Sequence, residues 1–144
     1  MKRWGVLFGG AAVVVPENGE SLETNIVRYG VTHVSLVATQ LFRILQSKNG
    51  PAALRRLKAI LVGGAAVSAS LLRQAHELGL RVHTTYGLTE MASQVTTTPP
   101  GASLDTLLTS GAPLRPDTIT VADDGEILVR GGTLFRGYVD PNGI

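Results

Sequence analysis

Residues 59–85, AILVGGAAVSASLLRQAHELGLRVHTT, decide the fold that this chain is expected to adopt. The stretch begins with four apolar residues that lead into two glycines, and it ends with a second strand-like run. Between these runs Ser68 or Ser70 can cap a helix with apolar residues at helical spacing, and Gly79 is suited to end that helix. Strand, helix and strand in this order predict a βαβ unit with parallel strands.

The preceding residues repeat the same alternation. The apolar run 11–15 predicts a buried strand, and residues 21–30 predict a helix that Ser21 caps. Residues 33–37 predict the next strand, and a helix opening at Thr39 would end before Gly50-Pro51. That helix would bury four apolar side chains on one side: Leu41, Phe42, Ile44 and Leu45. The fold class predicted for this half is α/β, a parallel sheet with flanking helices.

The composition changes after residue 94. Residues 96–101, TTTPPG, predict a loop because they combine two prolines with no helical period. The strand-like runs 118–122 and 126–130 flank an Asp-Asp-Gly sequence, which favours a hairpin. We therefore expect an α/β subdomain over residues 1–98 and a small antiparallel, barrel-like β subdomain over residues 99–144.

Composition limits the classes of function. The 144 residues suit one compact domain, and the absence of cysteine excludes a disulfide framework or a thiolate metal site. The net charge is only +2 and no dense basic stripe occurs, so no nucleic-acid partner is expected. No apolar run reaches the ~18 residues that predict a membrane span. We expect a cytoplasmic protein without a membrane span.

Two strand ends carry residues that suit ligand binding, because ligands of parallel sheets bind beyond the carboxyl ends of the strands. Gly63-Gly64-Ala65 offers backbone that a flat ligand can approach closely, although a tight turn explains the same residues. Tyr86, Thr89 and Glu90 supply an aromatic face, a hydroxyl and a carboxylate, which suit a base, a phosphate and Mg²⁺. A capping turn at the start of a helix is the alternative interpretation.

The stretch from Tyr86 to Glu90, Tyr-Gly-Leu-Thr-Glu, resembles the Tyr-Gly-x-Thr-Glu motif of the adenylate-forming superfamily, which includes acyl-CoA synthetases. Three further segments, 60–65, 125–131 and 134–138, resemble segments of that superfamily in the same order. Residues 84–95 are also similar to the branch of the superfamily that activates o-succinylbenzoate. The resemblance spans nearly the whole chain.

The resemblance implies an ATP- and Mg²⁺-dependent ligase that activates o-succinylbenzoate as an acyl-adenylate and transfers it to CoA in menaquinone biosynthesis. Another acyl- or aryl-CoA ligase, or a non-catalytic nucleotide-binding or interaction module, is the alternative. Thr89 and Glu90 are the implied catalytic residues, with Glu90 as the Mg²⁺ ligand, and Ser93 and Gln94 are the candidates for substrate contacts. The implied nucleotide-binding residues are Gly63, Gly64, Ala65, Tyr86, Gly87, Leu88 and Thr89.

Several parts that the superfamily uses do not occur in this sequence. They are the glycine-rich phosphate loop, the Thr-Gly-Asp segment, and the C-terminal domain with its catalytic lysine. We therefore expect the chain to be an internal segment of the large N-terminal domain and to be inactive by itself. We also expect it to self-associate, because strand edges and apolar faces would be exposed.

Overall fold

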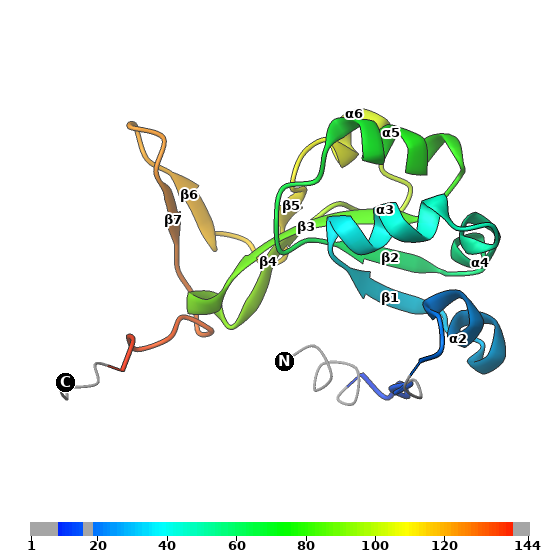
Figure 1. Ribbon diagram of the computed structural model, residues 1–144. Coiled ribbons are helices and arrows are strands. Elements are labelled where there is room, and N and C mark those ends of the chain that lie inside the picture. Colours follow the sequence, from blue (N-terminus) through cyan, green and yellow to red (C-terminus); the bar gives the residue numbers. More distant parts are fainter. Residues whose placement is uncertain (1–8, 16–18, 140–144) are drawn as a thin grey trace.

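A mixed sheet lies at the centre of the computed structural model, which describes residues 9–15 and 19–139 (Figure 1). The strands are ordered β1-β2-β3-β4-β5, and strands β1 to β3 are parallel while β3 to β5 are antiparallel. Their bounds are β1 His33–Leu36, β2 Ala59–Val62, β3 Val82–Leu88, β4 Ser93–Thr97 and β5 Ala112–Pro113. The predicted parallel α/β sheet is thus confirmed for β1 to β3, and an antiparallel extension adds to it.

The helices begin and end at the caps that the sequence offers. Ser21 accepts a hydrogen bond from the Thr24 backbone N–H, and Ser68 accepts one from Leu71. Gly30 and Gly79 end their helices in the left-handed conformation, at φ 61° and 67°. The helices are α2 Leu22–Tyr29, α3 Ala38–Gln46, α4 Gly50–Arg55, α5 Ala69–Glu77 and α6 Leu104–Leu107, with a 3₁₀ turn, η1, at Thr89–Met91.

One apolar core joins the helices to the parallel strands. α3 and α5 cover one face of the sheet, and α4 packs against both α2 and α3 (Figure 1). The side chains without exposed surface come from α3, α4, the loop between α4 and β2, β2 and α5: Leu41, Leu54, Leu57, Ile60, Val62 and Ala75. The core therefore fixes β2 and β3, the two strands whose ends carry the candidate site.

A separate two-stranded sheet follows. β6 (Ile119–Val121) and β7 (Ile127–Val129) form an antiparallel hairpin, as the Asp-Asp-Gly sequence predicts. Gly125 adopts φ 89°, and the Glu126 backbone N–H donates to the Asp124 side chain at 3.0 Å. The division between residues 98 and 99 stays a prediction, and β5, which follows it in sequence, pairs with β4.

Three expected features differ from the structure in the first half of the chain. Residues 11–15 form no strand, and Val15 is 63% exposed, because no described strand pairs with them. Phe42 is 52% exposed although Leu41 is buried, since adjacent helical residues point about 100° apart. The helix after β1 is capped at Val37 rather than at Thr39, and the Val37 N–H is bound by the Gln40 side chain.

One expected boundary is confirmed and another is wrong: α3 ends before Gly50-Pro51 as predicted, whereas the loop predicted from residue 96 begins later. Gly50-Pro51 follows the end of α3 but also starts α4, where proline suits the first turn. Residues 96 and 97, expected in a loop, complete β4, since β-branched threonines suit a pleated strand.

Candidate functional site

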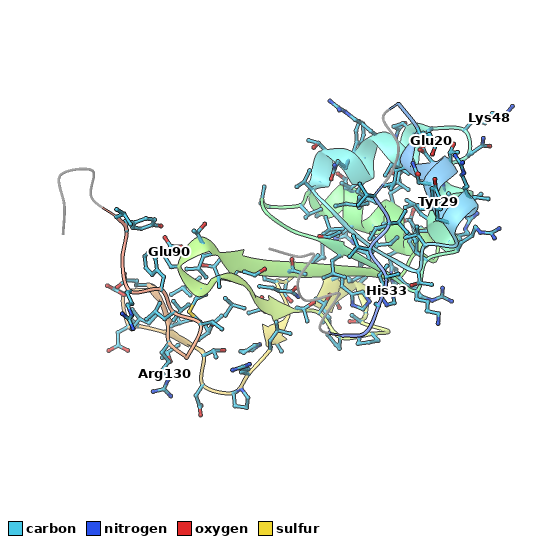
Figure 2. The ribbon with its side chains drawn as sticks, turned by 90° about the horizontal axis from the view of Figure 1, so that it is seen from below. Glu20, Tyr29, His33, Lys48, Glu90 and Arg130 are labelled. Carbon is cyan, nitrogen blue, oxygen red and sulfur yellow. The ribbon has the colours of Figure 1, made fainter. Side chains whose placement is uncertain are left out.

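The Tyr86–Glu90 motif lies on the hairpin formed by β3, η1 and β4. Tyr86 to Leu88 complete β3, and Thr89 and Glu90 form the first part of η1. Ala92 ends the turn in the left-handed conformation at φ 64°, and its N–H donates to the Thr89 carbonyl at 2.9 Å. Figure 2 shows Glu90 at the tip of this hairpin, far from the helical end of the molecule marked by Tyr29 and Lys48. A turn therefore presents the hydroxyl and carboxylate of the motif.

Gly87 allows the two strands of the hairpin to approach each other. The register shifts between Tyr86 and Gly87, which marks a β-bulge. A Cβ at position 87 would lie 2.3 Å from the Ser93 carbonyl oxygen and 2.8 Å from the Gln94 Cα. Gln94 pairs with Gly87, and Ser93 pairs with Leu88. The structure thus brings Ser93 and Gln94 directly across from the motif.

The glycines after β2 lie beside the start of the motif. A Cβ at Gly63 would lie 2.2 Å from the Thr85 hydroxyl oxygen, so only glycine fits there. Gly64 is exposed and adopts φ 86°. Because β2 and β3 are parallel and adjacent, residues 63–65 and Tyr86 follow the same edge of the sheet. The arrangement suits a flat ligand bound between a backbone wall and an aromatic ring.

Buried threonines hold the β3–β4 hairpin in place. The Thr84 hydroxyl donates to the Thr109 carbonyl at 2.7 Å, and the Thr96 hydroxyl donates to the Ser110 carbonyl at 2.6 Å. The Thr98 hydroxyl accepts from the Thr84 backbone N–H at 3.0 Å. The sequence analysis did not identify this network; the signal for it was the density of β-branched threonines on either side of the motif.

Glu90 is bound by the segment that follows β7. The Phe135 backbone N–H donates to the Glu90 carbonyl at 2.8 Å, and the Tyr138 hydroxyl donates to Glu90 Oε1. The rings of Phe135 and Tyr138 meet edge to face with their centroids 4.8 Å apart. The hydrogen bond from Tyr138 lowers the pKa of Glu90, and the same contact raises the pKa of Tyr138. Glu90 is therefore ionised at neutral pH.

The residues present fit a magnesium ion that is shared with phosphates. Within residues 9–15 and 19–139, no group of three or more histidine and acidic side chains is placed to hold a metal ion. Mg²⁺ bound with a nucleotide needs only one or two carboxylates, since phosphates and waters complete its shell. Ionised Glu90 beside the Thr89 hydroxyl matches that requirement, whereas a site made of protein ligands alone is not formed by the described residues.

The comparison with protein families agrees with this geometry. The profile of the family described as AMP-binding enzyme matches residues 1–139 of this chain. The chain belongs to the AMP-binding enzyme family. Among residues 9–15 and 19–139, the helices lack the length and the continuous apolar character of a membrane span.

Comparisons with individual members of the family point to one group of ligases within it. The chain is 37% identical over 138 residues to the 2-succinylbenzoate–CoA ligase of Escherichia coli K12, covering 96% of this chain and 28% of that protein. The chain thus spans less than a third of the length of this relative. Its fold matches the o-succinylbenzoate CoA synthetase of Bacillus subtilis in complex with ATP and magnesium, with a TM-score of 0.76 and 28% identity. That match covers 95% of this chain and 31% of the neighbour.

A second structure of the Bacillus subtilis synthetase, a double mutant bound with a product analogue, gives a TM-score of 0.81 at 29% identity. It covers 95% of this chain and 30% of the neighbour. The agreement includes both the parallel strands and the antiparallel extension, because nearly the whole of this chain is matched. The adenylate-forming fold expected from the motifs is confirmed.

One cavity in the described part of the chain does not contain the motif. It measures about 670 Å³ and lies among α2, the loop after α3, and α4, with Arg28, Lys48 and Arg56 in its lining. Its walls include none of the residues from Tyr86 to Gln94. We assign the candidate site to the β3–β4 hairpin, because the side chains of the motif converge there and none of them lines the cavity.

Proposed function

We propose that these residues form the adenine- and magnesium-binding part of an ATP-dependent acid–CoA ligase. In this proposal the whole enzyme activates o-succinylbenzoate as an acyl-adenylate and then transfers the acyl group to CoA. The observation that carries the proposal is the position of Tyr86–Glu90 at the end of β3, beside Gly63–Ala65 at the end of the neighbouring β2. The chain also aligns over 96% of its length with a 2-succinylbenzoate–CoA ligase. Activity in the cytoplasm and a role in menaquinone biosynthesis belong to the same proposal.

The nucleotide would bind along the edge that β2 and β3 share. Tyr86 would contact the adenine face, and Gly63, Gly64 and Ala65 would form the opposing wall. Gly87 and Leu88 would contribute backbone at the same edge. The Thr89 hydroxyl would donate a hydrogen bond to an oxygen of the α-phosphate, where the substrate carboxylate attacks. These roles are the ones that the family resemblance implies, and the position of the residues along one edge of the sheet supports them.

Glu90 would hold the magnesium ion of MgATP. When bound, the ion neutralises charge on the phosphates and polarises the phosphoryl oxygens. Glu90 contributes a carboxylate that stays charged at neutral pH, because its pKa lies below the ordinary value. Its position directly after Thr89 keeps the metal ligand and the phosphate-binding hydroxyl on one turn.

The acid would bind on the β4 side of the hairpin. Ser93 is exposed and Gln94 is half-buried, and both lie across from the motif. A hydroxyl and an amide can donate hydrogen bonds to a second carboxylate, which o-succinylbenzoate has and a monocarboxylic fatty acid lacks. We propose that these two side chains favour a dicarboxylate substrate.

Substrate-dependent ATP–pyrophosphate exchange tests the proposal in the full-length protein that carries these residues. We expect exchange with o-succinylbenzoate and little exchange with fatty acids or other aryl acids. Glu90→Gln should lower the exchange rate by about 10²-fold, because a charge on the phosphates loses its partner. Glu77→Gln, an exposed carboxylate on α5, is the matched control and should leave the rate unchanged.

Two results would contradict this proposal in different ways. Exchange with another acid but not with o-succinylbenzoate would reassign the substrate to another acyl- or aryl-CoA ligase reaction. Exchange with no acid in a full-length protein that binds ATP would favour a non-catalytic nucleotide-binding module. A normal rate in Glu90→Gln would remove Glu90 from the site.

We propose that the 144 residues alone neither adenylate an acid nor remain monomeric. Apolar side chains on the β6–β7 hairpin are exposed, with Val121 63% and Ile127 51% accessible. Exposed apolar surface and unpaired strand edges favour association. Size-exclusion chromatography with light scattering should show oligomers of the isolated chain, and pyrophosphate exchange by that chain should be undetectable. A monodisperse monomer or measurable exchange would contradict this.

A further inference from the structure

Residues 134–138, which resemble a segment of the superfamily, contact the motif from the far end of the described chain. The structure brings this segment to the motif, although Tyr138 and Glu90 are 48 residues apart in sequence. A tight turn precedes it, in which the Leu134 N–H donates to the Gly131 carbonyl at 3.0 Å. Gly131, which begins the turn, lies close to the buried Met91, and the segment that follows reaches η1 through the Phe135 N–H.

The segment holds Glu90 at two points. The Phe135 N–H fixes the backbone of Glu90 through its carbonyl oxygen, and the Tyr138 hydroxyl fixes the side chain through Oε1. The edge-to-face contact between the Phe135 and Tyr138 rings couples the two anchors to each other. A glutamate side chain normally moves among several rotamers. Anchoring both its backbone and its carboxylate removes much of that conformational freedom.

A carboxylate with one oxygen bound by a hydroxyl can still coordinate a cation through the other oxygen. Such outer hydrogen bonds orient metal ligands, and their loss typically weakens metal binding by ~10–100-fold. The donor here is a neutral hydroxyl, so it fixes the carboxylate without cancelling its charge. Tyr138 is 67% exposed, and its main described contacts are Glu90 and Phe135. The side chain is therefore not part of the apolar core.

We propose that Tyr138 is a positioning residue that holds Glu90 Oε1 and directs the remaining carboxylate oxygen to the divalent cation of the bound nucleotide. This inference rests on the proposed function, because it takes Glu90 as the metal ligand. Phe135 supports the same arrangement through its backbone N–H and its ring. The segment 134–138 thereby becomes part of the metal-binding side of the site.

The test compares Tyr138→Phe with the parent in the full-length protein. Binding of Mn²⁺ to the ATP complex, measured by electron paramagnetic resonance, should weaken by about 10-fold. ATP binding in the presence of EDTA, measured by calorimetry, should stay unchanged, since Tyr138 does not contact the nucleotide in the proposed arrangement. Tyr29→Phe removes the same hydroxyl from a tyrosine on α2 and is the matched control. It keeps the ring contact with Arg28 and should change neither measurement.

A double-mutant cycle separates positioning from a general structural effect. In the Glu90→Gln background, Tyr138→Phe should weaken Mn²⁺ binding no further, because the group that Tyr138 positions is already gone. Additive losses would overturn the inference, as would an unchanged Mn²⁺ affinity in Tyr138→Phe alone. Equal losses of Mn²⁺–ATP and metal-free ATP binding would also overturn it. A parent protein that binds ATP in EDTA but no Mn²⁺ would overturn the metal role, whereas a parent that binds no ATP at all would refute the proposed function.

Discussion

The helical body and the hairpin that carries the motif are stabilised in different ways. In the body, α2 to α5 and strands β1 to β3 share one continuous apolar core. At the β3–β4 hairpin, threonine hydroxyls bind backbone carbonyls, and Gly87 allows close contact between strands. Beyond it, the side chains of the β6–β7 hairpin are largely exposed. The candidate site therefore lies where backbone geometry and hydrogen bonds, rather than apolar burial, set the structure.

Apolar burial in the body and hydrogen bonds at the hairpin contribute different amounts to stability. Burying one large apolar side chain contributes about 1.5–3 kcal/mol, whereas one net hydrogen bond contributes about 1 kcal/mol. Substitutions in the body should therefore change global stability. Substitutions at the hairpin should act more locally, through the position of the motif. Four substitutions test this contrast.

The largest effect is expected from Leu54→Ala in α4. Leu54 has no exposed surface, so truncation leaves a cavity in the body and should lower the free energy of unfolding by about 2–5 kcal/mol. Ile127→Ala on β7, a residue that is 51% exposed, is the control and should change it by less than about 0.5 kcal/mol. Urea unfolding followed by circular dichroism measures both. Equal losses of unfolding free energy in Leu54→Ala and Ile127→Ala would contradict the view that apolar burial stabilises the body more than the exposed hairpin.

The next effect is expected from Gly87→Ala. The added Cβ would lie 2.3 Å from the Ser93 carbonyl oxygen, so β3 and β4 must separate, at a cost of about 1–3 kcal/mol. Amide hydrogen exchange at Ser93 and Gln94 should accelerate, while exchange in the helical body stays unchanged. Gly132→Ala is the matched control, because no heavy atom lies within 4 Å of a Cβ built there. Unchanged exchange in Gly87→Ala would show that the close approach does not constrain the hairpin.

A smaller effect is expected from Thr84→Val. This nearly isosteric change removes the 2.7 Å hydrogen bond to the Thr109 carbonyl and should cost about 1 kcal/mol. Thr120→Val on β6, where the side chain is exposed, should be neutral. Urea unfolding of the two variants gives the comparison. A loss as large as that of Leu54→Ala would mean that the polar network, rather than the apolar core, dominates stability.

The smallest effect is expected from a polar contact within the body. The Ser47 hydroxyl, 2.5 Å from Glu23 Oε1, is the main cause of the lowered pKa of Glu23. A lowered folded-state pKa gives stability that is present above the unfolded glutamate value of about 4.3 and is lost as the pH falls through the folded pKa. The parent should therefore lose more stability than Ser47→Ala between pH 6 and pH 3. Parallel pH profiles in urea unfolding would contradict this contribution.

Short-range patterns allowed much of the fold to be predicted. Ser21 and Ser68 cap helices, Gly79 ends one, and Asp-Asp-Gly turns a hairpin, because each effect involves residues only a few positions apart. The same reasoning failed where tertiary packing decides. Phe42 faces solvent and residues 11–15 form no strand, since burial depends on which elements lie next to them.

The sequence by itself determined the motif from Tyr86 to Glu90, the βαβ unit that carries it, and membership of the adenylate-forming superfamily. These follow from local spacing and residue chemistry. Only the tertiary structure decided that Ser93 and Gln94 face the motif across a β-bulge, and that Tyr138 binds Glu90. Whether residues a few positions apart pair across a bulge, or residues 48 positions apart meet, depends on the path of the folded chain, which local sequence patterns do not fix.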